Sequence, residues 1–400
     1  MAAPDKEVIK SELPDPKEVA KTYAEVAQRA SKLLADHIQK QVKKGITAPS
    51  DELGIAQAFM DMMGKLLANP YRLAQAQMNL VWDYFSLWQH SMMRLTGMPA
   101  TAPIAAPEKG DKRFKDEEWQ EHFLFDFIKQ SYLITARHIH DTVSTVDGLD
   151  DQSQKKVNFY TRQYIDALSP SNFALTNPEV FRETVKSHGQ NLIKGLNNLL
   201  RDVEDGGGNL RVRMTDTSAF ELGRNVATTP GKVVFQNEMM QLLQYTPSTP
   251  EVSKRPLLIV PPWINKFYIL DLREKNSYIK WCVDQGHTVF VISWVNPDER
   301  LAEKSFDSYL LEGTLAAVDA IVEQTGAKEI NAAGYCLGGT LLATTLAYMA
   351  GKKDKRLASG TFFTTMTDFA DPGELGVFID EGQVSSLEKK MFERGYLEGS

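Results

Sequence analysis

The sequence has only two cysteines in 400 residues, and it lacks any long uninterrupted apolar run. So few cysteines exclude a disulfide-stapled scaffold and favour a reducing compartment, so we expect a cytoplasmic protein. No stretch reaches the roughly 20 apolar residues of a membrane span, and residues 1–14 lack the apolar core of a signal peptide. The net charge of -7 offers no basic field, so nucleic acid is not an expected partner.

What is present is the composition of a soluble globular protein of about two domains, with 42% hydrophobic and 24% charged residues. Apolar residues recur at helical spacing over residues 16–96, and a Pro/Ala stretch at 98–107 is typical of a semi-rigid linker. A second, more aromatic helical pattern fills residues 114–200. We therefore predict an amphipathic helical arm at residues 1–103 and a helical domain at 104–215.

The pattern changes after the glycines at 206–208, where short apolar strands begin to alternate with helices. Residues 233–235 and 239–245 are typical of a hairpin. Helices are expected at 273–285 and 306–324, each ended by a glycine. Strands are expected at 257–260, 288–293, 330–333 and 361–365. This alternation predicts a mostly parallel, doubly wound α/β sheet over residues 216–400.

The strongest motif is Gly334-Tyr335-Cys336-Leu337-Gly338, which lies between a predicted strand and a helical pattern. This is the context of a nucleophile elbow, with cysteine where serine is usual. Small residues two positions before and after the nucleophile let the strand and helix approach each other. The start of the helix favours a thiolate, and the Leu337 N–H points to where an oxyanion would develop. The alternative is a buried structural cysteine in a glycine-rich turn.

A second oxyanion donor is expected after the 257–260 strand, in the sequence Pro-Pro-Trp-Ile at 261–264. Trp263 or Ile264 would donate, because proline has no N–H; a merely stiff turn is the alternative. Residues 294–297 follow another strand, and they would either line a pocket or simply pack.

The expected base is missing, since all seven histidines precede Cys336. His287 lies at the amino end of a strand, at the edge opposite to the elbow. Asp368 and Asp371 follow a later strand and are only weak candidates for an acid. Few strands are present for such a sheet, and we expect an incomplete enzyme that is inactive as these 400 residues.

No cofactor or metal is expected. His138 and His140 would lie on different faces of a helix, and the glycines at 206–208 lack the lysine and spacing of a phosphate loop. Cys282 is expected to be a small buried hydrophobe.

Several motifs in order carry a resemblance that covers nearly everything from residue 114 onward. They are Ala-Leu-Ser-Pro-Ser-Asn-Phe at 167–173, Thr-Asn-Pro-Glu at 176–179, Pro-Pro-Trp-Ile-Asn-Lys-Phe-Tyr-Ile-Leu-Asp-Leu at 261–272, Ser-Trp-Val-Asn-Pro at 293–297 and the elbow with Gly339 and Thr340. With them the chain resembles a class I polyhydroxyalkanoate synthase, a member of the α/β-hydrolase fold. Tyr335, Leu337 and the long helical N-terminal region resemble the enzymes for short 3-hydroxyacyl groups.

The resemblance implies an acyltransferase that loads 3-hydroxyacyl groups from CoA thioesters onto Cys336, releases CoA and extends a polyester, such as poly(3-hydroxybutyrate). It also implies a homodimer at the surface of polyhydroxyalkanoate granules, with granule-coating proteins as partners and the N-terminal helices assisting both. The base histidine and the aspartate of such synthases match no position here and are expected beyond residue 400.

Two other functions stay open at this point. A cysteine-dependent hydrolase of the thioesterase or dienelactone hydrolase type would share the elbow and the sheet. An inactive scaffold on granules would keep Cys336 only as a relic.

Overall fold

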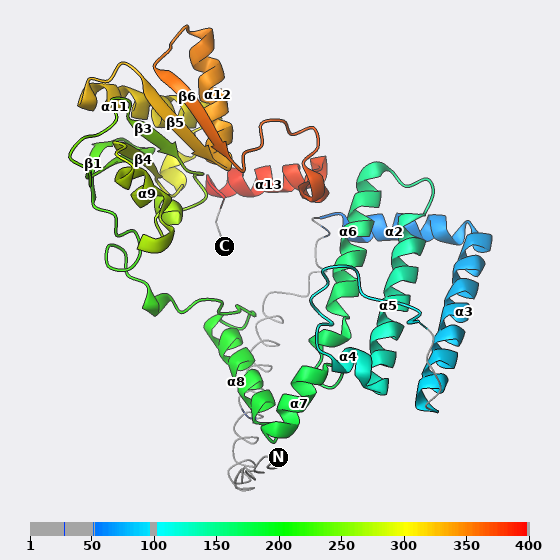
Figure 1. Cartoon of the computed structure of the whole chain (residues 1–400). Helices are drawn as coiled ribbons and strands as arrows, with labels where there is room; N and C mark the ends of the chain where they lie inside the picture. Colours follow the sequence, from blue (N-terminus) through cyan, green and yellow to red (C-terminus); the bar gives the residue numbers. More distant parts are fainter. Residues whose placement is uncertain (1–27, 29–50, 52, 97–101, 398–400) are drawn as a thin grey trace, which may run out of the picture. The chain divides into compact units, whose positions relative to one another are not determined.

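The computed structural model describes residues 28, 51, 53–96 and 102–397, and these divide into two units (Figure 1). The helical unit takes the described residues up to Met214, together with residues 374–383. The α/β unit takes residues 215–373 and those from Val384 onward. The amphipathic pattern at 16–50 and residues 98–101 of the expected linker lie outside the described residues, apart from residue 28.

Several helices of the helical unit begin at capping residues that are recognisable in the sequence. Asn69 and Asn177 each cap a helix that begins with proline, and Asp150 caps another by accepting a bond from the Ser153 N–H at 2.9 Å. The helices are α2 (Ile55–Leu67), α3 (Pro70–Leu95), α4 (Glu118–Glu121), α5 (Phe123–Ser144), α6 (Asp151–Ala167), α7 (Pro178–Lys186) and α8 (Gln190–Asp205). The predicted helical content of this region is confirmed.

The described part of the expected arm packs inside this unit. Leu87 of α3 and Ile134 of α5 are fully buried in one apolar cluster, and α2 meets α6 around Met62 and Val157. Residues 55–95 therefore lie against the helices that follow them in sequence. The limit of an arm at residue 103 stays a prediction.

A buried charged cluster joins α3 to α5. The Asp126 carboxylate accepts bonds from Arg94 at 2.5 Å and Gln130 at 2.9 Å, and it pairs with Lys129 at 3.0 Å. Lys129 also donates to the Trp119 carbonyl at 2.7 Å. Because each of these groups has a partner, the cluster fixes how the two helices meet.

The α/β unit holds a six-stranded sheet in the order β1-β2-β4-β3-β5-β6. β1 and β2 form an antiparallel hairpin, β2 runs antiparallel to β4, and the other neighbours are parallel. The strands are β1 (Gly231–Gln236), β2 (Met240–Tyr245), β3 (Leu257–Val260), β4 (Val289–Trp294), β5 (Ile330–Tyr335) and β6 (Leu357–Phe363). The predicted hairpin and the mostly parallel sheet are confirmed.

Helices cover the two faces of this sheet (Figure 1). Phe290 and Ile292 of β4 face a core completed by α11 (Ala316–Thr325) and α12 (Leu337–Gly351). Val289 and Val291 face a second core completed by α9 (Tyr278–Asp284). The alternation along one strand thus produces the doubly wound arrangement that was predicted.

Two predicted boundaries were wrong. The helix expected at 273–285 begins only at Tyr278, because the Ser277 hydroxyl caps it, accepting from the Lys280 N–H and donating to the buried Asp271. The strand expected at 361–365 spans Leu357–Phe363, and it ends where Thr364 adopts a positive φ of 43°.

The helix expected at 306–324 is present but irregular. It begins with α10 (Phe306–Ser308), continues through a π-helical segment, η6 (Tyr309–Leu315), and ends in α11 before Gly326 at a φ of 67°. The remaining helix, α13, spans Glu381–Arg394.

Candidate active site at the carboxyl edge of the sheet

Cys336 lies in a strained turn between β5 and α12, with φ 52° and ψ -124°. The Cys336 N–H donates to the Phe363 carbonyl at 3.0 Å, and the Cys336 carbonyl accepts from Gly339 at 2.9 Å and Thr340 at 3.2 Å. A non-glycine residue in such a conformation persists only where its surroundings hold it. The backbone of a nucleophile elbow is therefore present at the predicted cysteine.

The glycines around Cys336 are required by close backbone contacts. A Cβ atom on Gly338 would lie 2.1 Å from the Val260 carbonyl oxygen, and one on Gly334 would lie 2.4 Å from the Cα of Gly339. A Cβ on Gly339 would in turn meet the Thr365 hydroxyl at 1.9 Å. The contacts of Gly334 and Gly338 fit the prediction from the motif, whereas the demand on Gly339 was not predicted.

The two predicted oxyanion segments lie close to the elbow. Leu337 is the first residue of α12, so its N–H has no acceptor within the helix. In the sheet, Val260 pairs with Gly334, which brings the 261–264 segment beside the elbow. Trp263 is half-buried and Ile264 is 69% exposed. The roles of Leu337, Trp263 and Ile264 as donors stay predictions.

Trp294 ends β4 and is buried, with 9% of its surface exposed. Its indole Nε1–H donates to the Pro261 carbonyl at 2.7 Å, and its ring lies 5.4 Å from that of Tyr309. The sequence left a pocket or a packing role open for this residue, and no pattern predicted this hydrogen bond. Asn296 accepts a bond from Lys266 at 3.0 Å.

The weaker candidates differ in where the structure places them, and a role for Asp368 or Asp371 as the acid stays a prediction. His287 precedes β4, and it lines a cavity at the amino ends of the strands, the edge opposite to Cys336. Asp368 and Asp371 are exposed, and each accepts a bond from the backbone of its own turn, from Ala370 and Gly373. Among the described residues of the α/β unit, His287 is the one histidine, so this unit brings no imidazole to the elbow.

Cys282 is the other thiol of the chain, and it is buried as predicted, with 1% of its surface exposed. Burial raises the pKa of the Cys282 thiol, while a hydrogen bond with Tyr278 opposes this. A buried, protonated thiol is a poor nucleophile, which leaves Cys336 as the candidate.

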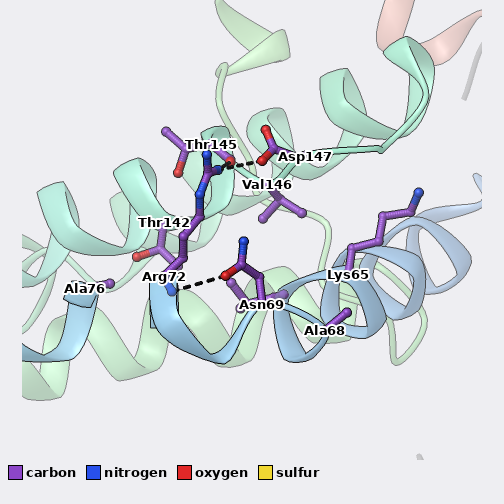
Figure 2. A pocket seen from close by; sticks show the side chains of 10 residues that line it. Lys65, Ala68, Asn69, Arg72, Ala76, Thr142, Thr145, Val146 and Asp147 are labelled. Carbon is purple, nitrogen blue, oxygen red and sulfur yellow. Dashed lines mark hydrogen bonds and ion pairs between the residues drawn. The ribbon is translucent and has the colours of Figure 1, made fainter. Parts of the chain in front are cut away.

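A cavity of about 280 Å³ lies in the helical unit, between the start of α3 and the end of α5. Figure 2 shows the side chains that line it. Arg72 lines it, but this guanidinium pairs with Asp147 at 2.9 Å and donates to the Thr145 carbonyl at 2.8 Å. Lys65 likewise donates to the Gly148 carbonyl. These cations stabilise the helix contact, so the cavity offers no obvious ligand site.

No group of three or more His, Cys, Asp or Glu side chains is arranged to hold a metal in the described part of the chain. His138 instead binds Asp83 at 2.6 Å and so links α5 to α3. Within the same residues, no helix is long and apolar enough to cross a membrane.

The sheet order, the parallel strands and the strained cysteine between β5 and α12 define an α/β-hydrolase fold with a cysteine in the nucleophile position. Among solved structures, a putative hydrolase from Agrobacterium vitis S4 is 11% identical with a TM-score of 0.28, and the match covers 40% of this chain and 60% of that one. The fold assignment rests on the topology and the elbow rather than on this likeness.

Sequence comparisons show which proteins this chain is similar to. Residues 110–282 match the family described as Poly-beta-hydroxybutyrate polymerase (PhaC) N-terminus. A poly(3-hydroxyalkanoate) polymerase from Methylorubrum extorquens is 52% identical over 84% of this chain and 55% of its own length. Polymerase subunits from Rhizobium etli and Cupriavidus necator are 46% and 40% identical, over 97% and 82% of this chain.

Over most of its own length the chain is thus similar to poly(3-hydroxyalkanoate) polymerases. It covers 62% of the Rhizobium etli relative and 54% of the Cupriavidus necator relative, and thus spans somewhat more than half the length of these proteins.

Proposed function

We propose that this protein polymerises (R)-3-hydroxyacyl groups from CoA thioesters into polyhydroxyalkanoate through an acyl-enzyme at Cys336. The observation that carries the proposal is the strained elbow at Cys336, at the carboxyl edge of the sheet, in a chain that is similar to poly(3-hydroxyalkanoate) polymerases. The substrate is itself the CoA thioester, and the proposal involves no cofactor or metal.

In the first step the Cys336 thiolate attacks the thioester carbonyl, and CoA leaves as its thiol when the tetrahedral intermediate collapses. The Leu337 N–H and the N–H of Trp263 or Ile264 would stabilise the oxyanion of that intermediate. A 3-hydroxyl group then attacks the enzyme thioester and passes its proton to a base; the ester bond forms as the acyl C–S bond breaks and the Cys336 thiolate leaves. Because one thioester is exchanged for another, the acyl-enzyme keeps its reactivity towards an alcohol while water is excluded.

The proton transfers need a base, and we propose that it comes from outside the described α/β unit. The histidine of that unit lies at the other edge of the sheet, and Cys282 is buried and protonated. A histidine oriented by a carboxylate is the usual partner of a cysteine nucleophile.

The experiment compares wild type with Cys336→Ala in the full-length protein, supplied with 3-hydroxybutyryl-CoA. We expect CoA release and polymer formation to fall by a factor of about 1,000 or more in the variant. Cys282→Ala is the matched control, and it should leave the specific activity unchanged. Polymer formation that survives Cys336→Ala would favour the scaffold, and free 3-hydroxybutyrate without polymer would favour a hydrolase.

A preference for short acyl groups is also part of the proposal, because Tyr335 and Leu337 flank the cysteine as in the class I enzymes that the chain resembles. We expect 3-hydroxybutyryl-CoA to be used with a higher kcat/KM than 3-hydroxyoctanoyl-CoA. Equal values for the two thioesters would contradict this assignment.

We further propose that the protein works in the cytoplasm at the surface of polymer granules, as a homodimer and with granule-coating proteins as partners. Support comes from an exposed apolar stripe on α3, in which Trp82 is 63% and Trp88 is 53% exposed. The other members of the stripe are Met78, Val81, Phe85, Met92 and Leu95. Residues three or four apart share one side of a helix, so the stripe suits an apolar surface.

The test is co-sedimentation of the full-length protein with poly(3-hydroxybutyrate) particles. Replacing Trp82 and Trp88 by serine should weaken binding by about tenfold or more, because two large apolar groups no longer leave water. Tyr164→Ser, which removes an exposed aromatic from α6, should bind as wild type does. A double variant that turns monomeric yet still binds particles would identify the stripe as a dimer contact instead.

A further inference from the structure

We propose that Trp294 is a positioning residue for acyl transfer, because its indole N–H holds the segment that supplies the second oxyanion donor. The inference rests on the proposed function of Cys336, and it adds a residue that acts through the Pro261 peptide.

The hydrogen bond from Trp294 to Pro261 lies at a point where the chain has few other ties. Pro261 and Pro262 have no N–H, so this part of the segment cannot donate to its neighbours. The Pro261 carbonyl is buried and accepts from the indole Nε1–H at 2.7 Å. Trp263 and Ile264 follow directly, so the direction of their N–H groups depends on how the Pro261 peptide is held.

The same peptide also lies against the elbow. A Cβ on Gly338 would lie 2.6 Å from the carbonyl carbon of Pro261 and 2.7 Å from its oxygen. Gly338 is in the first turn of α12, two residues after Cys336. The Pro261 peptide thus contacts both the Trp294 indole and the helix that begins with the Leu337 N–H.

The indole ring is in turn fixed by the π-helical segment η6. A Cβ on Gly313 would lie 2.4 Å from Cη2 and 2.5 Å from Cζ3 of Trp294, so the ring occupies the space that this glycine leaves free. Trp294 also contacts the Tyr309 ring from the same segment. π-Helical segments occur often at functional sites. Here the segment fixes the Trp294 ring, which in turn orients the N–H groups of Trp263 and Ile264.

Oxyanion donors act only when they lie about 2.7 to 3.1 Å from the developing charge, so a small rotation of the 261–264 peptides weakens catalysis. The oxyanion charge develops only on the way to the tetrahedral intermediate, so its donors stabilise the transition state more than the bound substrate. Loss of the Trp294 hydrogen bond should therefore slow acylation of Cys336 and change KM little.

The experiment uses Trp294→Phe in the full-length protein, which removes the N–H and keeps an aromatic ring. We expect the single-turnover release of CoA from 3-hydroxybutyryl-CoA to fall by about 10- to 100-fold, with KM within about threefold of wild type. Alkylation of Cys336 by iodoacetamide, followed by peptide mapping, should keep its wild-type rate, because it generates no oxyanion. Trp281→Phe, at a tryptophan that is 56% exposed on α9, is the matched control.

Gly313→Ala supplies a second variant, which keeps the indole but pushes it out of place. It should also slow acylation, yet have little further effect in the Trp294→Phe background, since phenylalanine lacks the Cη2 and Cζ3 atoms that would clash. If Trp294→Phe does not fold, the effect of Gly313→Ala on acylation tests the positioning role of Trp294.

Two outcomes would overturn the inference. Acylation by Trp294→Phe at the rate of Trp281→Phe would exclude the positioning role, and a parallel loss of alkylation and acylation would reduce Trp294 to a structural residue. Acylation that persists in Cys336→Ala would instead refute the proposed function.

Discussion

The two units of this protein bury different kinds of side chain. In the α/β unit, residues 289–292 of β4 are all fully buried and all apolar. The helical unit buries charged groups such as Asp126, Lys129 and Lys156, while it leaves the tryptophans of the α3 stripe in solvent. Closely packed central strands can hold one strained residue in place, whereas buried ion pairs fix orientation and leave apolar surface for other uses.

The largest expected effect comes from a substitution at the elbow of the α/β unit. Gly338→Ala puts a methyl group 2.1 Å from the Val260 carbonyl oxygen, so the turn must open. We expect acyl transfer to fall by about 1,000-fold or more and amide exchange to accelerate in β3, β5 and α12, but not in the helical unit. Gly351→Ala, in the last turn of α12 where a Cβ meets nothing within 4 Å, is the control. Equal activities of these two variants would show that the elbow is not tightly packed.

The next effect belongs to the helical unit. Asp126→Asn leaves the buried Lys129 ammonium and Arg94 without their carboxylate, which should destabilise this unit by about 3 to 5 kcal/mol. Amide exchange should accelerate in α3 and α5, while Cys336 is alkylated at its wild-type rate. Asp141→Asn, at an exposed carboxylate, should change stability by less than about 0.5 kcal/mol. If both units loosened together, the distinction between them would be wrong.

The smallest effect concerns pH. The hydrogen bond from Lys156, with an N–O distance of 2.6 Å, lowers the pKa of the Asp380 carboxyl in the folded helical unit. Because the folded value lies below the unfolded one of about 3.9, the ionised carboxyl stabilises the unit above that pH. This contribution is lost as pH falls through the lowered pKa.

Thermal unfolding followed between pH 7 and pH 3 measures how much the ionised Asp380 carboxyl stabilises the unit. Asp380→Asn should be less stable than wild type at pH 7, and the gap should narrow as the solution becomes acidic. Glu381→Gln, one residue along, should follow the wild-type curve. A constant gap at all pH values would mean that the pair contributes nothing through its charge.

Much of the α/β unit could be predicted because its signals are local. The short apolar runs between helical patterns, the glycines that stop helices and the spacing around Cys336 predicted the strands, the mostly parallel sheet and the elbow. The start of α9 was missed because it depends on Asp271, which is buried and bound to Ser277, and burial of a polar group leaves no local pattern.

The hydrogen bond between Trp294 and Pro261 was missed for a similar reason. Its partners are 33 residues apart and meet only because β3 and β4 are neighbours in the sheet. The demand on Gly339 likewise depends on Thr365, which a sequence pattern cannot place beside it. Contacts made across elements follow from the fold rather than from the motif that lies within it.

The π-helical segment η6 also sets the rotation about the helix axis at which the following residues of α11 face the sheet. A wide turn here carries one residue more than an α-helix of the same rise, and one residue corresponds to a rotation of about 100°. Within it, Leu310 packs in the core beside the sheet and Gly313 meets the Trp294 ring; after it, Val318 and Ile321 are fully buried. Shortening residues 309–315 by one would turn one of these faces into solvent, so the length of this segment is constrained as well as its glycine at position 313.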